Sequence, residues 1–299
     1  LELTKLYIKR LKQHNSSLFC VINLTEDLAL KQAKRADSLL KNGIILGPLH
    51  GIPYGLKDLI SVEGYPTTWG AYPYKNQRIN KTATIARELE RSGAVLVAKL
   101  VSGSLARGDV WFGGKTRNPW DPKQGASGSS AGSGSATAAG LVGCSIGTET
   151  LGSIVSPSTR NGITGLRPTY GRVSRNGVMS LSWSMDKVGP MCRSAIGCAI
   201  VFEAIYGKDP LDPTSVDASY FFNIESKPEK YKIGYLKDLI EKDTTDSGDN
   251  IRNVINLLKQ NGISLLPINL PKNYPFKVFD IILRSESGAH FDELVRSGK

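Results

Sequence analysis

Two segments of the chain pass from a helical pattern through a glycine into an apolar run, and this order limits the folds open to it. Residues 82–93, TATIARELERSG, have helical spacing and end in glycine, and the apolar run AVLVAKL follows at 94–100. Residues 136–147, ATAAGLVGCSIG, combine a small-residue helix with a second buried strand. Alternating helices and buried strands are typical of an α/β sheet. We therefore expect a mixed α/β domain.

The same alternation extends over most of the chain. We expect helices over residues 2–14 and 25–42, the latter with Thr25 as N-cap and Gly43 as C-cap, and a short strand at 19–23. Further helices are predicted near 194–207, 250–262 and 276–296, with strands at 232–236 and 263–268. No internal repeat or linker interrupts this order, so residues 1–299 are expected to form a single domain.

Charge and histidine content exclude some kinds of chemistry. Lys and Arg total 38 against 27 Asp and Glu, and the resulting charge of +11 is only a weak indication of nucleic-acid binding over 299 residues. The three histidines, His14, His50 and His290, leave little material for a His-rich metal site. We expect no metal, and a hydrolytic reaction would need another base.

The cysteines and the apolar stretches indicate where the protein works. Its four cysteines stand in apolar runs without a CxxC pair, which is typical of buried, reduced thiols in a cytosolic protein. They are Cys20, Cys144, Cys192 and Cys198. No apolar stretch approaches the roughly 18 residues of a membrane helix. A soluble, cytoplasmic protein without membrane attachment is expected.

The segment GGKT at 113–116 suggests a phosphate-binding loop, because a glycine turn with Lys and Thr can surround an anion. The full pattern requires a glycine at position 109, which is Asp109 here. An ordinary glycine turn is therefore the prediction.

The run GASGSSAGSGS at 125–135 has two interpretations. Its composition is that of a flexible linker, but it leads without polar spacing into an apolar segment. A Gly/Ser loop at the start of a helix instead offers backbone donors and hydroxyls for acyl transfer. Within it, GSSAG also fits the GxSxG nucleophile elbow with Ser130 as nucleophile. The only histidine downstream of Ser130 is His290.

A second hydroxyl-bearing segment is GTETLGSIVSPSTRNGITGLRPTYGRVS at 147–174. Ser153 follows Gly152, where the N–H groups of residues 150–153 could converge on a developing oxyanion. A serine after a glycine is by itself more often structural.

Lys57, in GIPYGLKDLI at 51–60, is flanked by apolar residues on an expected strand. Either its stem snorkels to place the ammonium in water, or the amine is buried and acts as a base. The local pattern alone favours snorkelling. Strand alternation directs Asp58 to the opposite face, so Asp58 need not neutralise Lys57.

Together, GIPYGLKDLISVEGYPTTWGA, GSSAGS and TETLGSIVSPSTRNGITGLRPTYGRVS resemble the amidase signature family, from about residue 3 to the end of the chain. The resemblance implies a mixed β-sheet core flanked by helices on both faces, with a catalytic core at about 45–205. It also implies a Ser, cis-Ser, Lys triad, here Ser153, Ser129 and Lys57, with a separation of 24 positions between the two serines. Thr150, Leu151 and Gly152 correspond to the family's oxyanion loop.

Three functions are open under this resemblance. The first is an amide hydrolase that cleaves a small carboxamide through an acyl-enzyme, without a cofactor. The second is the A component of a tRNA-dependent amidotransferase, which releases ammonia from glutamine and has partner subunits and tRNA. The third is a non-catalytic binding protein with the same fold. Homodimer formation is left open.

The chain departs from the family pattern at several positions. Leu151 replaces a usual glycine and Val155 a frequent arginine, while residues 126–128 and 99–102 replace the PGG and GKTN elements. The family domain is longer than 299 residues, so we expect an incomplete amidase domain, truncated at both ends and lacking its C-terminal part. These departures concern the substrate more than the reaction.

Overall fold

The computed structural model describes residues 1–223, 231–271 and 273–298. The chain divides into two compact units, Leu1–Tyr220 with Ile281–Lys299 and Phe221–Asp280. The expectation that residues 1–299 form one amidase domain stays a prediction.

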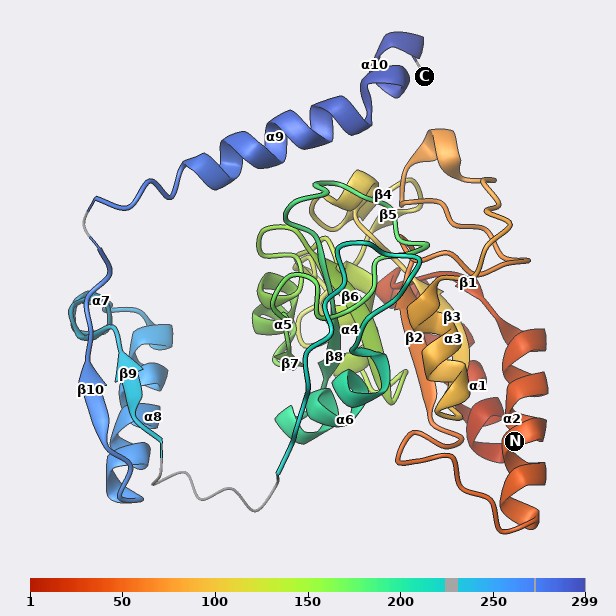
Figure 1. Ribbon diagram of the computed structural model, residues 1–299, viewed down its shortest axis with the longest axis horizontal. Coiled ribbons are helices and arrows are strands. Elements are labelled where there is room, and N and C mark those ends of the chain that lie inside the picture. Colours follow the sequence, from red (N-terminus) through yellow and green to blue (C-terminus); the bar gives the residue numbers. More distant parts are fainter. Residues whose placement is uncertain (224–230, 272, 299) are drawn as a thin grey trace. The chain divides into compact units, whose positions relative to one another are not determined.

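A six-stranded mixed sheet forms the centre of the first unit (Figure 1). Its order is β1 (Val21–Leu24), β3 (Val95–Leu100), β2 (Pro53–Lys57), β6 (Cys144–Glu149), β8 (Lys187–Cys192) and β7 (Thr164–Gly165). Strand β2 runs parallel to both β3 and β6, and the remaining pairs are antiparallel. The mixed sheet predicted from the sequence is confirmed.

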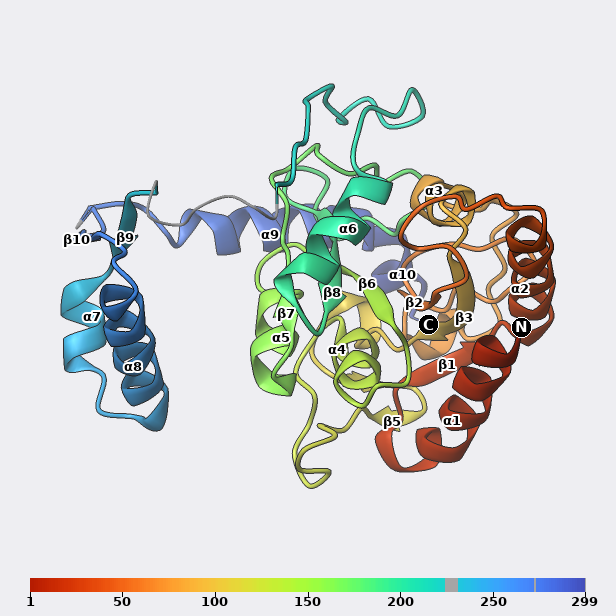
Figure 2. The ribbon, with the colours of Figure 1, turned by 90° about the horizontal axis from the view of Figure 1, so that it is seen from below.

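Helices cover both faces of this sheet (Figures 1 and 2). Tyr54 and Leu56 of β2 pack in one core with α3 (Thr84–Arg91) and α6 (Ala195–Ile205). The other core joins β3 to α1 (Glu2–Leu18), α2 (Glu26–Lys41) and α4 (Ala131–Ala138). Side chains alternate along β3, with Leu96 in the first core and Val95 and Val97 in the second.

Helix α2 follows the predicted bounds closely, and Thr25 is its N-cap residue as predicted. The Thr25 hydroxyl, however, donates to the carbonyl of Leu96 at 2.7 Å and makes no capping hydrogen bond to the helix. The reason is that Thr25 is fully buried against β3, where its hydroxyl has a closer acceptor. Asn42 is the C-cap residue, and Gly43 follows it with φ +74°.

The Gly/Ser run does not form a linker. It leads into α4, whose first turn packs directly on the sheet. A β-carbon on Gly132 would lie 2.3 Å from the carbonyl oxygen of Cys20 and from the nitrogen of Val101, so this close approach requires glycine. Ser133 and Ser145 bridge α4 and β6 by hydrogen bonds. The small residues of the run therefore hold the helix close to the sheet.

The remaining elements are short. In the first unit they are η1 (Tyr72–Tyr74), η2 (Ser104–Ala106), β4 (Val110–Trp111), β5 (Gly114–Lys115) and α5 (Val155–Asn161). In the GGKT segment, Gly113 lies in the turn between the antiparallel strands β4 and β5, and Gly114 and Lys115 form β5. The second unit contains β9 (Ile233–Tyr235), α7 (Lys237–Lys242), α8 (Asp246–Gln260) and β10 (Leu265–Pro267), with β9 and β10 parallel.

From residue 281 onward the chain belongs to the first unit again, through α9 (Val278–His290) and α10 (Asp292–Ser297). The carboxylate of Glu286 accepts hydrogen bonds from the hydroxyls of Ser182 and Ser184. Phe291 packs with Leu59 and Met179 in a small apolar cluster. These contacts attach the last helices to the loop before β8.

All four cysteines are buried and unpaired by disulfides. Among the helices of the described ranges, none combines the length and apolar character needed to cross a bilayer.

Candidate active site

Lys57 is the last residue of β2, at the carboxyl end of three parallel strands. Because Tyr54 and Leu56 face the α3 and α6 side, alternation turns Lys57 toward α4. Its side chain is 0% exposed. Nζ lies 2.7 Å from Oγ of Ser129, 2.8 Å from Oγ1 of Thr148 and 3.3 Å from the Thr148 carbonyl oxygen. The snorkelling interpretation is therefore wrong, because the packed sheet leaves the stem no path to water.

Burial lowers the pKa of Lys57 from 10.5 to about 7, because the charged amine loses its hydration. The carboxylates of Asp186 and Glu149 act in the opposite direction. Within the described ranges, no carboxylate oxygen lies within 4.0 Å of Nζ. A large share of the amine is therefore neutral near pH 7.

Asp58 forms an ion pair with a different lysine, Lys99. Its Oδ1 lies 2.6 Å from Nζ of Lys99, and both side chains are 0% exposed. The other oxygen accepts hydrogen bonds from the N–H and hydroxyl of Thr68. The expectation that Asp58 leaves Lys57 unneutralised is confirmed.

Ser129 lies just before α4, where the chain returns to the carboxyl end of the strands. It is buried, and the peptide bond between Gly128 and Ser129 is cis. The neighbouring Ser130 is buried too, but its hydroxyl donates to the Thr148 carbonyl at 3.1 Å and accepts from the Thr148 N–H at 3.2 Å. Ser130 thus ties α4 to β6 and is not oriented as a free nucleophile.

The loop from Glu149 to Val155 carries Ser153 and is fixed at several points. The Glu149 carboxylate accepts from the N–H groups of Ile154 at 2.8 Å and Val155 at 2.9 Å, which closes the loop against the start of α5. The Thr150 hydroxyl donates to Asp186, and its carbonyl accepts from Nζ of Lys187 at 2.9 Å.

This loop has backbone N–H groups that are not used as donors. The N–H groups of Leu151, Gly152 and Ser153 donate no hydrogen bond within the described ranges. Gly152 has φ +94°, which side-chain-bearing residues rarely adopt. Leu151 is 55% exposed. Successive free N–H groups of this kind can stabilise an oxyanion.

The three residues of the expected triad come from separate elements. Lys57 and Ser129 are in direct contact. Ser153 is joined to this pair through its main chain, since its carbonyl accepts from the N–H of Ser130 at 3.3 Å. The Ser153 hydroxyl, which is partly exposed, makes no hydrogen bond with any residue in the described ranges.

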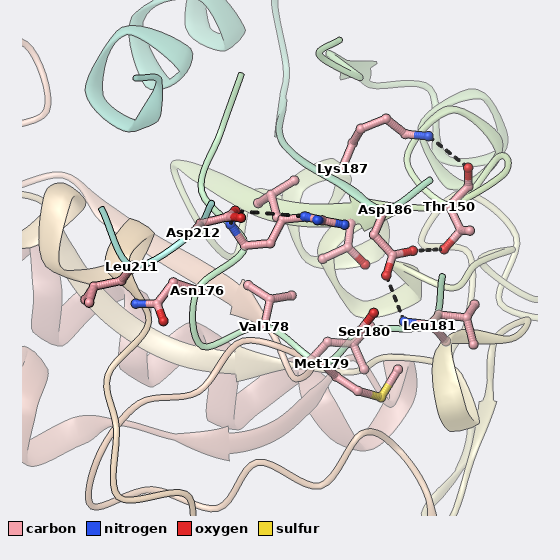
Figure 3. Close-up of a pocket in the computed structure, with 15 residues that line it drawn as sticks. Thr150, Asn176, Val178, Met179, Ser180, Leu181, Asp186, Lys187, Leu211 and Asp212 are labelled. Atoms are coloured by element: carbon pink, nitrogen blue, oxygen red, sulfur yellow. Dashed lines mark hydrogen bonds and ion pairs between the residues drawn. The ribbon is translucent and has the colours of Figure 1, made fainter. Parts of the chain in front are cut away.

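A cavity of about 190 Å³ adjoins the loop (Figure 3). Thr148 and Thr150 belong both to its lining and to the site, and Leu59, two residues after Lys57, extends the wall. Val178 and Met179 supply apolar surface, while Asp186 and Lys187 stand beside Thr150. The cavity therefore meets the loop that carries Ser153 at Thr150.

Comparison with known sequences shows the family. The family model described as Amidase matches residues 2–293. The chain belongs to the amidase family. A curated relative is the A component of the glutamyl-tRNA(Gln) amidotransferase of Chloroflexus aurantiacus. It is 35% identical over 297 residues, which cover 97% of this chain and 61% of the relative. The chain thus spans about three fifths of the length of such relatives.

Solved amidase-family structures share the fold. Native peptide amidase from Stenotrophomonas maltophilia superposes with a TM-score of 0.86 at 32% identity, covering 98% of this chain and 64% of that one. The A component of the glutamyl-tRNA(Gln) amidotransferase of Thermotoga maritima gives a TM-score of 0.85 at 26% identity, covering 99% and 65%. The amidase-signature fold expected from the sequence is confirmed.

Several residues of the site were not predicted from the sequence. Thr148 contacts the Lys57 amine, Asp186 holds the Thr150 hydroxyl, and Lys187 holds the Thr150 carbonyl. Thr148 could have been suspected, because it ends the apolar run GCSIG before the Ser153 block. No group of three His, Cys, Asp or Glu suited to a metal occurs in the described ranges.

Proposed function

We propose that this chain carries the catalytic centre of an amide hydrolase that uses Ser153, Ser129 and Lys57. The observation that supports this most strongly is the buried Lys57 amine, with its pKa near 7, in contact with the Ser129 hydroxyl at 2.7 Å. A lysine in this state can accept a proton near neutral pH. A purely structural lysine in the core would be expected to have a carboxylate partner, as Lys99 has.

In this proposal, Ser153 Oγ attacks the carbonyl carbon of an amide. The Ser153 proton passes to Ser129 Oγ, while the Ser129 proton passes to the neutral amine of Lys57. The tetrahedral intermediate then collapses, and the same path returns a proton to the leaving nitrogen as the C–N bond breaks. Water attacks the acyl-enzyme with the same proton relay and releases the carboxylic acid and free Ser153.

The oxyanion loop has a separate part in this reaction. We propose that the free N–H groups of Leu151, Gly152 and Ser153, after Thr150, stabilise the oxygen of the intermediate. The ties from Glu149, Asp186 and Lys187 hold the loop before the substrate arrives. Such preorganisation avoids reorientation during the reaction.

A fluorophosphonate probe with mass mapping tests the nucleophile in the full chain. Labelling is expected on Ser153 and should disappear in Ser153→Ala. The matched control is Ser130→Ala, which removes the neighbouring buried hydroxyl and should still be labelled. Modification of Ser130, or no labelling of an active preparation, would contradict the assignment.

The second candidate is a component of a tRNA-dependent amidotransferase, which would use the same residues to release ammonia from glutamine. It is favoured by the 35% identity to the curated amidotransferase relative. Co-purification with partner subunits, together with glutaminase activity that depends on them, would support it. Hydrolysis of simple amides by the isolated chain would favour the amidase instead.

A non-catalytic binding protein is the third function considered. Turnover that survives Lys57→Ala or Ser153→Ala unchanged would favour it, because the measured turnover would then not depend on this site. The cytoplasmic location and the homodimer stay predictions.

A further inference from the structure

The turn that precedes β8 spans residues 181–186 and borders the cavity beside the oxyanion loop. Leu181 and Asp186 belong to the lining of that cavity (Figure 3). The Ser182 carbonyl accepts from the N–H groups of Met185 at 3.1 Å and Asp186 at 2.9 Å. Because these two bonds close the turn on itself, Ser182 and Asp186 should move together.

Asp186 joins this turn to the oxyanion loop. Its Oδ1 accepts from the Thr150 hydroxyl, and its Oδ2 accepts from the N–H groups of Leu181 at 2.7 Å and Ser182 at 3.0 Å. Figure 3 shows the carboxylate between Thr150 and Leu181. Thr150 directly precedes the free N–H groups of residues 151–153. The position of the turn therefore affects where these N–H groups point.

Glu286 of α9 holds the same turn at a second point. Its Oε2 accepts from the Ser182 hydroxyl and from the Ser184 N–H at 3.1 Å, and its Oε1 accepts from the Ser184 hydroxyl at 2.6 Å. Hydrogen bonds to a carboxylate are stronger than those between neutral groups. Glu286 therefore restrains the turn more firmly than an uncharged acceptor would.

Ser182 connects the two carboxylates. Its hydroxyl donates to Glu286, its N–H donates to Asp186, and the residue is 0% exposed. A continuous series of hydrogen bonds thus leads from α9 through Ser182 and Asp186 to the Thr150 hydroxyl. Each link lies within the first compact unit of the chain.

Two other attachments should keep the structure intact without the Glu286 carboxylate. The Trp183 carbonyl accepts from Arg175 and from the Tyr170 hydroxyl, both at 2.7 Å, which holds the turn independently. Phe291 packs in the small apolar cluster described above and attaches the last helices. Loss of the carboxylate should therefore make the position of the turn less exact rather than unfold it.

We propose that Glu286 is a positioning residue for the oxyanion loop. Through Ser182 and Asp186 it holds Thr150, so that the N–H groups that follow are directed at the developing oxyanion before the substrate binds. Small displacements of such donors reduce the rate strongly, because their contribution depends on preorganised geometry. Glu286 itself lies outside the cavity lining. This inference rests on the proposed amide hydrolysis and concerns the control of that site.

The test measures hydrolysis of butyramide by the full chain and by Glu286→Ala. Both kcat and kcat/KM are expected to fall by about tenfold with little change in KM, because oxyanion donors act mainly in the transition state. The inflection near pH 7 should remain, since the relay to Lys57 is intact. The limiting rate of Ser153 modification by the fluorophosphonate probe should fall in parallel, because the same donors stabilise the phosphonyl oxygen.

Two variants provide controls. Glu286→Gln keeps a carbonyl oxygen that can accept from the Ser182 hydroxyl, and it should recover most of the lost turnover. Glu293→Ala removes an exposed carboxylate from α10 and should leave kcat unchanged. Recovery in the first and no effect in the second would show that the hydrogen bond matters, and not the net charge of the last helices.

A double-variant cycle separates positioning from a purely structural role. Thr150→Val removes the hydroxyl that Asp186 holds and should itself lower kcat. Adding Glu286→Ala to it should cause little further loss, because the connection is already broken. If Glu286 only fastened α9, the same fractional loss would occur in both backgrounds.

If Glu286→Ala does not fold, Ser182→Ala breaks the same connection while Ser184 still holds Glu286. Unchanged kcat in the folded variant, a change in KM alone, or equal losses with and without the Thr150 hydroxyl would overturn the inference. Failure of the proposed function is distinguishable, because the wild-type chain would then neither hydrolyse butyramide nor be labelled at Ser153. If the wild-type chain is labelled but does not hydrolyse butyramide, the limiting rates of labelling decide the comparison.

Discussion

Nζ of Lys99 lies 2.6 Å from Oδ1 of Asp58, with both side chains fully buried, directly beside the strand end that carries Lys57. Lys57 and Asp58 are adjacent in sequence but therefore have opposite electrostatic surroundings. Asp58 is paired with Lys99, whereas Lys57 is surrounded by hydroxyls and a carbonyl. The ion pair engages the Asp58 carboxylate, which would favour the charged form of Lys57 if it faced that amine.

The ion pair between Lys99 and Asp58 predicts that single and double substitutions differ in their effect on the free energy of unfolding. Lys99→Met is expected to lower the free energy of unfolding by about 3–5 kcal/mol, because the buried Asp58 carboxylate loses its counter-charge. Combining it with Asp58→Asn should recover part of that loss. Urea denaturation of both single variants and the double variant gives the coupling energy. Additive effects would show that the pair is not coupled.

Activity should depend on the protonation of Lys57. Because burial lowers the pKa of Lys57 to about 7, kcat/KM is expected to rise with pH up to about 7 and then level off. Below that value the amine holds its proton and cannot accept another. His290→Gln is the control, since a histidine base would give a similar profile. Loss of the inflection in that variant would contradict the assignment to Lys57.

The same lysine should reduce stability. The folded pKa of Lys57 lies below the unfolded value of 10.5, so the unfolded state binds more protons between about pH 7 and 10.5. Lys57 therefore lowers the free energy of unfolding by its full amount below about pH 7, and this effect disappears as the pH rises toward 10.5. Lys57→Met should increase the free energy of unfolding at pH 7 by about 2 kcal/mol, after allowance for lost hydrogen bonds.

That gain should shrink between pH 7 and pH 10, which denaturation at several pH values can follow. If the gain in free energy of unfolding did not vary with pH, the charge of Lys57 would be the same in the folded and unfolded states. Lys208→Met, which removes an exposed ammonium, is the matched control and should show no comparable trend.

The helix–glycine–strand order predicted the mixed sheet. The contact between Lys57 and Ser129 was implied only by the family resemblance of the three motif blocks. The local sequence pattern nevertheless favoured snorkelling for Lys57. Burial depends on the parallel pairing of β2 with β6, which no local pattern reveals. The spacing of the blocks identified the site better than the surroundings of the lysine did.

Neither strand β8 nor its part in the site could be predicted from the sequence. It contains Gly189 and Pro190, residues that argue against an interior strand, although it lies between β6 and β7. Its antiparallel register places Lys187 opposite Glu149, next to Thr150. The hydrogen bond from Lys187 to the oxyanion loop spans 37 residues and follows from that register alone.

Substitutions of the adjacent residues Ser129 and Ser130 should have different effects, on turnover and on stability respectively. Ser129→Ala is expected to reduce turnover by about 10²–10⁴-fold, because the proton relay to Lys57 is broken, with a small effect on stability. Ser130→Ala removes both hydrogen bonds to the Thr148 backbone and should lower the free energy of unfolding by about 1–3 kcal/mol while retaining more activity. Kinetics and urea denaturation of the two variants distinguish these roles, and the reverse pattern would assign the relay to Ser130.

The backbone at Gly152 offers a test of the oxyanion loop itself. Its φ of +94° is close to the +84° of Gly64, and at both positions a β-carbon would meet no atom within 4 Å. Alanine at either site should therefore cost a similar strain of about 1–3 kcal/mol in stability. Only Gly152→Ala should lower kcat, by about tenfold or more, because relief of the strain rotates N–H groups away from the oxyanion. Equal kinetic effects in the two variants would show that the loop geometry does not contribute to catalysis.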